Sequence, residues 1–369
     1  MKADKAVRID RRKTLPEAPE SGHNRWHPSI EPILAVDPGE VVCIETRDAY
    51  DGQLGPGSSA DDVARLDIGR THPLTGPIHV NGAEPGDVLE VEVLEVQPGA
   101  WGCGLVLPGV GLLGEYFGEA WFAGFDLGDD CAVSPQIPGV RLPASPFMGV
   151  MGVAPDHAFL QRTLAYESAL DIPSYQPVRA RSAVPDTEAV RSQGLITIPP
   201  RSNGGNVDIK QWTAGVVVSL PVQVEGARFS TGDAHYTQGD SECISGLEMP
   251  ATLYCRFGLS KGEARQRGMA DPEYRRDSFF APPEIAVPKR FHATTGQSFD
   301  YNVPGTHDSI SVAARNALLN MIRFIEHRYG YDAQQAYMIV SLAADLKISQ
   351  AVNQPNFTAS VILPLDIFD

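Results

Sequence analysis

Basic residues and cysteines are scarce in this sequence. It has 30 lysines and arginines against 46 aspartates and glutamates, and a formal net charge of -16. That balance argues against a nucleic-acid or anionic-membrane partner, because both require basic patches. The five cysteines form no C-x-x-C pair, and their odd number and wide spacing favour reduced thiols in the cytoplasm. No run of about 18 apolar residues occurs, so we expect no membrane span.

Several common catalytic motifs are also missing. The sequence has no G-x-S-x-G elbow and no H-E-x-x-H motif, which argues against an α/β-hydrolase and a zincin. No G-x-G-x-x-G motif opens a helix after a strand, so a dinucleotide site of the Rossmann type is not expected. The basic stretch at residues 1–13 is not followed by an apolar segment, and we expect no secretory signal there.

Glycine and proline are abundant and separate short apolar runs. The 35 glycines and 30 prolines are typical of turns that join strands. In residues 87–96, Leu89, Val91 and Val93 alternate with Glu90 and Glu92, which predicts a half-exposed strand. Helical spacing of apolar residues appears only over 311–345, with a capping-box pair at its second helix. We therefore predict an α+β protein that is mainly β, dominated by a sandwich or barrel.

The pattern also suggests how the chain is organised. We expect a solvated tail over residues 1–23 and one folded unit over residues 24–369. Within that unit, β subdomains are expected at about 24–160 and 195–260, joined by a polar connection at 165–194. Residues 261–303 form a polar, proline-rich insertion, which predicts a functional flap, an oligomer contact or a disordered loop. A helical segment over 311–345 follows.

Acidic, amide and imidazole side chains gather on both sides of the apolar run 215–224. They are Asn206, Asp208, Asp233, His235, Asp240 and Glu242. Carboxylates are rarely buried without a partner, and oxygen ligands with one histidine suit zinc or a similar divalent ion. On an extended strand, residues i and i+2 share a face, which pairs Asp233 with His235 and Asp240 with Glu242. This segment is the candidate site.

Several candidate residues, in this segment and elsewhere, also have an ordinary structural interpretation. An Asp-x-His pair is common in hairpin turns, and Asp48 at a strand end is typical of an Asx turn. The loop histidines His72 and His79 are more often structural than ligands. Cys243 follows Glu242, but strand alternation directs the two side chains apart, which favours a buried thiol over a nucleophile.

In combination, these blocks resemble the acetamidase/formamidase family. The matching segments, in family order, are 48–53, 75–87, 148–155, 204–208, 232–242 and 345–350. The similarity spans about residues 24–364, and segment 232–242 is its most specific part. Three positions depart from the family: Ser241 replaces a usual glycine, Asn81 a frequent glutamate and His79 a frequent aromatic residue.

The resemblance implies an enzyme that hydrolyses a linear carboxamide to a carboxylate and ammonia. It also implies a jelly-roll-like β-sandwich with a barrel-like part and a smaller C-terminal α/β portion containing the two helices near 311–345. Homo-oligomers and a divalent metal, zinc or calcium, are further expectations that the resemblance brings.

Amide hydrolysis requires a polarised carbonyl, an activated water and a protonated leaving nitrogen. A divalent ion serves the first two needs, and a carboxylate with a raised pKa can carry the proton. Of the candidates, we assign His235 and Asp233 to the metal, with Asp208 or Asp48 completing its shell. The remaining assignments are Glu242 as general base and acid, Asp240 as its orienting partner, and Asn206, His72 and His79 as substrate-binding residues.

Two alternatives from other classes remain open. One is a metal-dependent hydrolase of a different non-peptide C–N bond, such as a larger or cyclic amide. The other is a non-enzymatic β-sandwich protein that binds metal or carbohydrate, in which the acidic cluster holds a structural ion.

Overall fold

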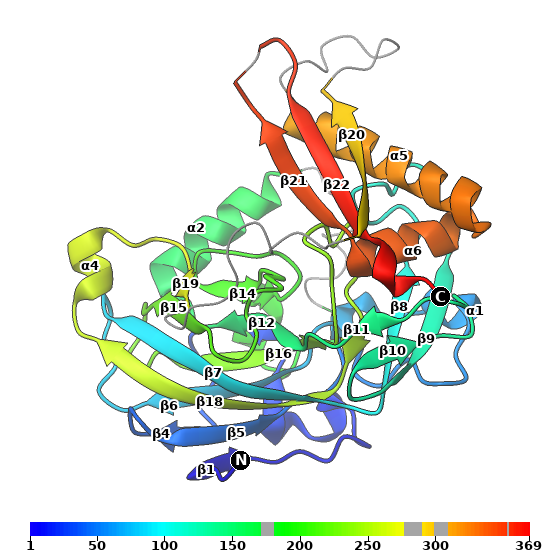
Figure 1. Cartoon of the computed structure of the whole chain (residues 1–369). Helices are drawn as coiled ribbons and strands as arrows, with labels where there is room; N and C mark the ends of the chain where they lie inside the picture. Colours follow the sequence, from blue (N-terminus) through cyan, green and yellow to red (C-terminus); the bar gives the residue numbers. More distant parts are fainter. Residues whose placement is uncertain (171–180, 277–289, 299–308, 353) are drawn as a thin grey trace.

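The computed structural model describes residues 1–170, 181–276, 290–298, 309–352 and 354–369 (Figure 1). Within these residues the strands form two large sheets and two small ones. The first large sheet has the order β1 (Lys5–Val7), β5 (Val41–Glu45), β18 (Ala251–Ser260), β7 (Val88–Pro98), β15 (Val217–Pro221) and β19 (Glu273–Arg275).

The second large sheet carries the candidate site. Its main path is β11 (Leu142–Pro143), β10 (Cys131–Val133), β9 (Trp121–Leu127), β8 (Trp101–Val106), β17 (Glu248–Met249), β16 (Phe229–His235), β12 (Phe147–Gly152) and β14 (Gly204–Asn206). Strand β6 (Leu74–Val80) also pairs with β16, and it joins β2 (Gly22–His23) and β4 (Leu34–Val36) to this sheet. Strand β16 therefore lies between several neighbours and is buried along its whole length.

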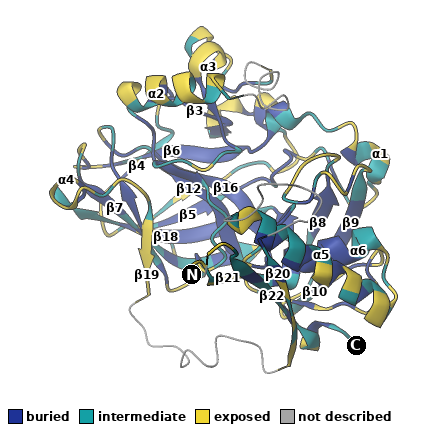
Figure 2. Ribbon diagram, turned by 90° about the horizontal axis from the view of Figure 1, so that it is seen from above, coloured by how far each residue is buried: buried dark blue, intermediate teal, exposed yellow. Residues whose placement is uncertain are grey.

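The two large sheets pack on each other through apolar side chains. Phe229 of β16 and Phe257 of β18 meet across the interface, with their ring centroids 5.2 Å apart. On β7, Val91 and Val93 are fully buried, whereas Glu90 and Glu92 are half-exposed, so the predicted alternation is confirmed. Figure 2 shows the central strands as buried. The mainly β prediction is confirmed, but neither large sheet closes into a barrel within the described part of the chain.

The remaining elements lie around this core. Helices α1 (Ala60–Val63), α2 (His157–Ser168), α3 (Glu188–Gln193) and α4 (Glu263–Arg267) are short, and β13 (Leu195–Ile196) pairs with β3 (Arg25–Trp26). Helices α2 and α3 were not predicted from the sequence; they expose much of their surface in Figure 2 and bury only Leu160 and Val190 respectively. Their apolar periodicity is correspondingly weak.

The C-terminal portion contains the two predicted helices. Helix α5 (Ile310–Tyr329) ends at Gly330, whose φ of 77° is the left-handed conformation that glycine adopts readily. Helix α6 (Ala333–Ala343) begins with a capping box between Asp332 and Gln335, as predicted. Helix α5 packs on a three-stranded sheet of β20 (Phe291–Gln297), β22 (Thr358–Pro364) and β21 (Asp345–Gln350) (Figure 1).

Two predictions about segments need correction. Residues 1–23 are not a solvated tail: β1 pairs in parallel with β5, and Leu15 is fully buried, with its N–H donating to Asp51 Oδ1 at 2.7 Å. The polar stretch 261–303 is not one loop either, because β19 extends the first sheet and β20 joins the C-terminal sheet. Helix α4 also lies in this stretch, whereas residues 277–289 and 299–303 are outside the described residues.

Among the described residues, no helix combines the length and apolarity needed to cross a membrane.

Close packing of α5 on β20 generates a prediction about stability. A Cβ atom at Gly296 would overlap backbone atoms of Ala313 and Ala317, which cannot move without shifting the helix. We therefore expect Gly296→Ala to lower the free energy of unfolding by about 1–3 kcal/mol through overpacking. Gly55→Ala is the matched control, since nothing lies within 4 Å of its added methyl group. Urea unfolding of both variants measures the difference, and equal stabilities would contradict the packing argument.

Candidate active site

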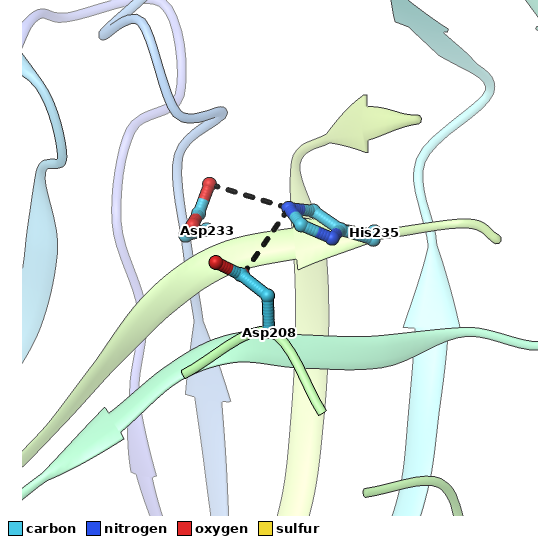
Figure 3. Close-up of side chains that lie close together, drawn as sticks. All are labelled: Asp208, Asp233 and His235. Carbon is cyan, nitrogen blue, oxygen red and sulfur yellow. Dashed lines mark ion pairs between the residues drawn. The ribbon is translucent and has the colours of Figure 1, made fainter. Parts of the chain in front are cut away.

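Side chains that are distant in sequence meet around one imidazole ring. The Nε2 atom of His235 lies 3.6 Å from Asp233 Oδ1 and 4.0 Å from Asp208 Oδ1 (Figure 3). It also lies 3.0 Å from Glu248 Oε2. Ligand-type atoms of His235, Glu242 and Glu248 lie within 4.8 Å of one another, as do those of Asp208, Asp233 and His235. We call these five residues the acidic cluster.

Strand pairing explains how the acidic cluster forms. Asp233 and His235 are at the end of β16, and His235 pairs directly with Glu248 of the neighbouring antiparallel strand β17. Directly paired residues in an antiparallel ladder share a face, so their side chains meet. Asp208 follows β14, which reaches β16 through β12. Glu242 lies in the connection between β16 and β17.

The backbone of the acidic cluster is held in a costly conformation at three positions. Asp208, Asp233 and Glu242 have φ angles of 48°, 53° and 26°. Non-glycine residues in this region cost of order 1–3 kcal/mol each and occur preferentially at functional sites. Gly149 of β12 makes the arrangement sterically feasible, because a Cβ atom there would lie only 2.5 Å from Asp208 Oδ1. The backbone therefore favours carboxylate positions that an ordinary strand would not provide.

Burial and mutual charge shift the pKa values in the acidic cluster. Burial raises the pKa of Glu242 to about 7 and that of Glu248 to about 8. It also raises the pKa of Asp208 well above its usual value. Burial alone would lower the pKa of His235, but the carboxylates of Glu248 and Asp233 outweigh it and raise that pKa. The facing histidines keep the pKa of Asp233 below its ordinary value despite burial.

The donor set fits a divalent cation. Four buried atoms of the acidic cluster form no hydrogen bond of acceptable geometry with the described residues: Asp208 Oδ1, Asp233 Oδ1, His235 Nε2 and Glu248 Oε2, the last two being an ion pair at 3.0 Å. Buried acceptors without donors are rare in folded proteins and indicate an ion or water that satisfies them. Carboxylate oxygens with one imidazole nitrogen are ligands that zinc accepts. These residues therefore match the predicted chemistry of a metal centre.

Three predicted site residues make contacts outside the acidic cluster. The Asp48 carboxylate accepts from the N–H groups of Tyr50 and Gly52, both at 3.0 Å, and so forms the Asx turn that was its alternative interpretation. Asp240 is exposed, and its carboxylate accepts from Gln211 Nε2 at 2.9 Å instead of orienting Glu242. His79 lies against Gly226, beside the start of β16, whereas His235 ends that strand.

Of the other two predicted residues, His72 lies beside the acidic cluster, and Asn206 precedes the cluster residue Asp208 by two positions. His72 Nε2 is 3.7 Å from Asp233 Oδ2, and burial lowers the pKa of this histidine. Asn206 donates to the Ile198 carbonyl at 3.0 Å, and its buried Oδ1 has no partner among the described residues. Both side chains retain a buried atom without a hydrogen-bond partner among the described residues: Nδ1 of His72 and Oδ1 of Asn206.

Glu248 is the main residue that the sequence analysis missed. It lies in an apolar segment 13 positions after His235, and only the hairpin pairing of β16 with β17 brings it to the ring. A lone buried glutamate in an apolar run was the available signal, since such a residue needs a partner. Cys243 is 2% exposed, and burial raises the pKa of its thiol to about 12. It is a buried thiol, as favoured from the sequence.

Comparisons with known proteins identify relatives of this chain. An acetamidase of Mycolicibacterium smegmatis is 33% identical over 362 residues, which cover 90% of this chain and 88% of the relative. A formamidase of Methylophilus methylotrophus is 33% identical over 386 residues, covering 98% and 93%. A solved structure described as a gamma lactamase from Delftia acidovorans superposes with a TM-score of 0.90 at 32% identity, covering 99% of this chain and 93% of the other.

A family model accounts for nearly the whole chain. The model of the Acetamidase/Formamidase family matches residues 8–369, a range that includes all five residues of the acidic cluster. With the two relatives at 33% identity over most of their length, this match confirms the resemblance seen in the sequence. The chain belongs to the Acetamidase/Formamidase family.

Proposed function

We propose that this protein hydrolyses a short linear carboxamide to a carboxylate and ammonia, using a divalent ion held in the acidic cluster. Family membership makes the chain an amide hydrolase. The observation that carries the metal assignment is the set of four buried ligand-type atoms around His235 that form no hydrogen bond of acceptable geometry with the described residues. A metal ion would offset the repulsion among carboxylates that burial alone leaves uncompensated.

We assign the ion to Asp208, Asp233 and His235, with Glu248 replacing Asp48 as the further ligand. Zinc is our choice, with calcium as the alternative. The imidazole nitrogen of His235 favours zinc, because calcium prefers a shell made only of oxygen ligands. When bound, a divalent ion supplies carbonyl polarisation and lowers the pKa of a water toward about 7.

Glu242 is the proposed proton carrier. A carboxylate whose pKa burial raises to about 7 can accept and return a proton near neutral pH. In the proposed reaction the oxygen of water bonds to the carbonyl carbon, and Glu242 takes the proton of that water. The C–N bond then breaks as Glu242 returns the proton to the nitrogen, which leaves as ammonia. His72 and Asn206 are the proposed substrate contacts, because both have unused hydrogen-bonding atoms, and His72 also lies 3.7 Å from Asp233 Oδ2.

A second candidate substrate is a cyclic amide. The solved structure with a TM-score of 0.90 is described as a gamma lactamase. Ring opening of a γ-lactam breaks the same type of C–N bond, but the amine stays attached to the product and no ammonia is released. The two candidates are therefore separated by their products.

The subunit arrangement and location are also proposals. We propose a cytoplasmic homo-oligomer, which the family resemblance supports, with all five cysteines free in the structure as reduced thiols would be. Light scattering that gives a monomeric mass would contradict the oligomer.

The first experiment measures products from a panel of amides before and after chelation. We expect formamide, acetamide or propionamide to release ammonia, chelation to abolish release, and added zinc to restore it. For a γ-lactam in the same panel, turnover is measured as formation of the ring-opened amino acid, because no ammonia is released. Turnover that survives exhaustive metal removal, verified by elemental analysis, would contradict the metal role while leaving amide hydrolysis intact.

Replacing the proposed proton carrier tests its role. Glu242→Gln should lower kcat by roughly 10²–10⁴-fold, because the amide side chain cannot take the proton from water. Metal content and thermal unfolding should remain close to those of the unmodified protein. Asp240→Asn is the matched control two residues away: its carboxylate is exposed and bonded to Gln211, so activity should be retained. Near-normal turnover by Glu242→Gln would remove Glu242 from the mechanism.

Filling the space beside the carboxylates tests their placement. In Gly149→Ala the added methyl would lie 2.5 Å from Asp208 Oδ1 and 2.8 Å from the main-chain oxygen of Asp233, so the Asp208 carboxylate and the backbone that carries Asp233 must shift. We expect kcat/KM to fall roughly 100-fold, as is typical when reacting groups are misplaced by about 1 Å. Gly118→Ala, where the methyl enters open space, is the control. Full activity in Gly149→Ala would show that these carboxylates are not needed where the structure places them.

A further inference from the structure

Gln238 contacts two members of the acidic cluster with one side chain. Its Oε1 lies 2.8 Å from His235 Nδ1, and its Nε2 donates to the main-chain oxygen of Asp208 at 2.8 Å. The side chain is buried, with the residue 5% exposed. His235 and Asp208 come from different segments, so one amide group joins both candidate ligands.

The contact with Asp208 determines which way the amide points. A main-chain carbonyl oxygen can only accept, so the end of Gln238 that faces it must be the NH₂ group. The carbonyl end of the amide then faces His235 and can only accept a hydrogen bond. The Nδ1 atom of His235 must therefore carry a hydrogen, whatever the state of Nε2.

This arrangement leaves Nε2 as the metal-binding nitrogen of His235. It is Nε2 that faces Asp208, Asp233 and Glu248, and it has no hydrogen-bond donor among the described residues. Ligating histidines in proteins usually donate their other N–H to an acceptor, which fixes the ring and its tautomer. The geometry of Gln238 matches that arrangement.

We propose that Gln238 is a positioning residue that prepares His235 and Asp208 to bind the divalent ion. The proposal rests on the metal centre of the proposed function and adds a residue outside the ligand set. Asp208 has a φ of 48°, a conformation that its own backbone does not favour. The hydrogen bond from Gln238 to the carbonyl of Asp208 helps to hold that residue while the same amide orients the ring of His235.

The support for Gln238 extends to helix α6. The next residue, Gly239, donates its N–H to the Ser341 carbonyl at 3.0 Å near the end of that helix. A side chain at Gly239 would overlap the Ala344 carbonyl, so the chain passes close to the helix here. Gln238 also lines a cavity of about 740 Å³, together with Gln211. Within the described part of the chain, Gln211 bonds to Asp240 and to no member of the acidic cluster, which makes it the matched control.

The experiment measures metal affinity directly, so it does not depend on a known substrate. Full-length Gln238→Met, Gln238→Glu and Gln211→Met are stripped of metal and titrated with zinc against a chromophoric chelator. Cobalt is then added to each, and its visible absorption reports the ligand geometry. Circular dichroism and thermal unfolding establish that each variant is folded.

We expect Gln238→Met to weaken zinc affinity roughly 10–100-fold and to alter the cobalt spectrum, because both hydrogen bonds are lost. Gln238→Glu keeps an acceptor for the Nδ1 hydrogen and should restore a large part of the affinity. Gln211→Met should match the unmodified protein. If Gln238→Met does not fold, the decisive comparison is between Gln238→Glu and Gln211→Met. An unchanged cobalt spectrum with reduced zinc affinity in Gln238→Glu supports a positioning role for the hydrogen bond to the Asp208 carbonyl.

Two results would overturn the inference. If folded Gln238→Met binds zinc within threefold of the unmodified protein with an unchanged cobalt spectrum, Gln238 does not position the ligands, although the metal centre itself stands. If the unmodified protein binds neither zinc nor cobalt, the metal part of the proposed function fails and takes this inference with it.

Discussion

Repulsion among buried acceptors is the constraint on which the site depends. The carboxylates of Asp208, Asp233 and Glu248 face the Nε2 atom of His235 inside the protein. Burying charged groups away from water costs free energy unless they are paired. A proton or a cation must lie among them for the arrangement to be stable. The remaining features of the site, including the strained backbone and the missing side chain at Gly149, follow from holding these groups together.

The fold holds these groups in place through the sheet around β16 and through helix α6. Strand β16 is buried between paired neighbours, which fixes Asp233 and His235 in a rigid sheet. The connection that follows β16 is held from outside by α6: Tyr337 donates to the Cys243 carbonyl at 2.7 Å, and Ser341 donates to the Ser245 carbonyl at 2.8 Å. The C-terminal portion supplies none of the five cluster residues, yet it holds the segment that carries Glu242.

Much of the architecture follows from local patterns. Alternation in β7, helical spacing in α5 and the capping box of α6 were each predicted and are each observed, because they depend on neighbours along the chain. The tail assignment for residues 1–23 failed because this segment is held by distant partners: β1 pairs with β5, and the Leu15 N–H donates to Asp51, 36 positions away. Asp240 was misplaced for a related reason. The i, i+2 rule assumes an extended strand, whereas the chain turns between β16 and β17.

The sequence by itself determined the family, the mainly β class and the presence of acidic groups near His235, since these depend on residue types and their spacing. The tertiary structure decided which acidic groups meet. Glu248 enters through strand pairing, Asp48 is taken up by its own turn, and Gln238 joins two segments 30 positions apart. The sequence specifies the chemistry of each side chain. A cation site also needs ligand atoms within a few ångströms of one another, and only long-range packing brings them that close.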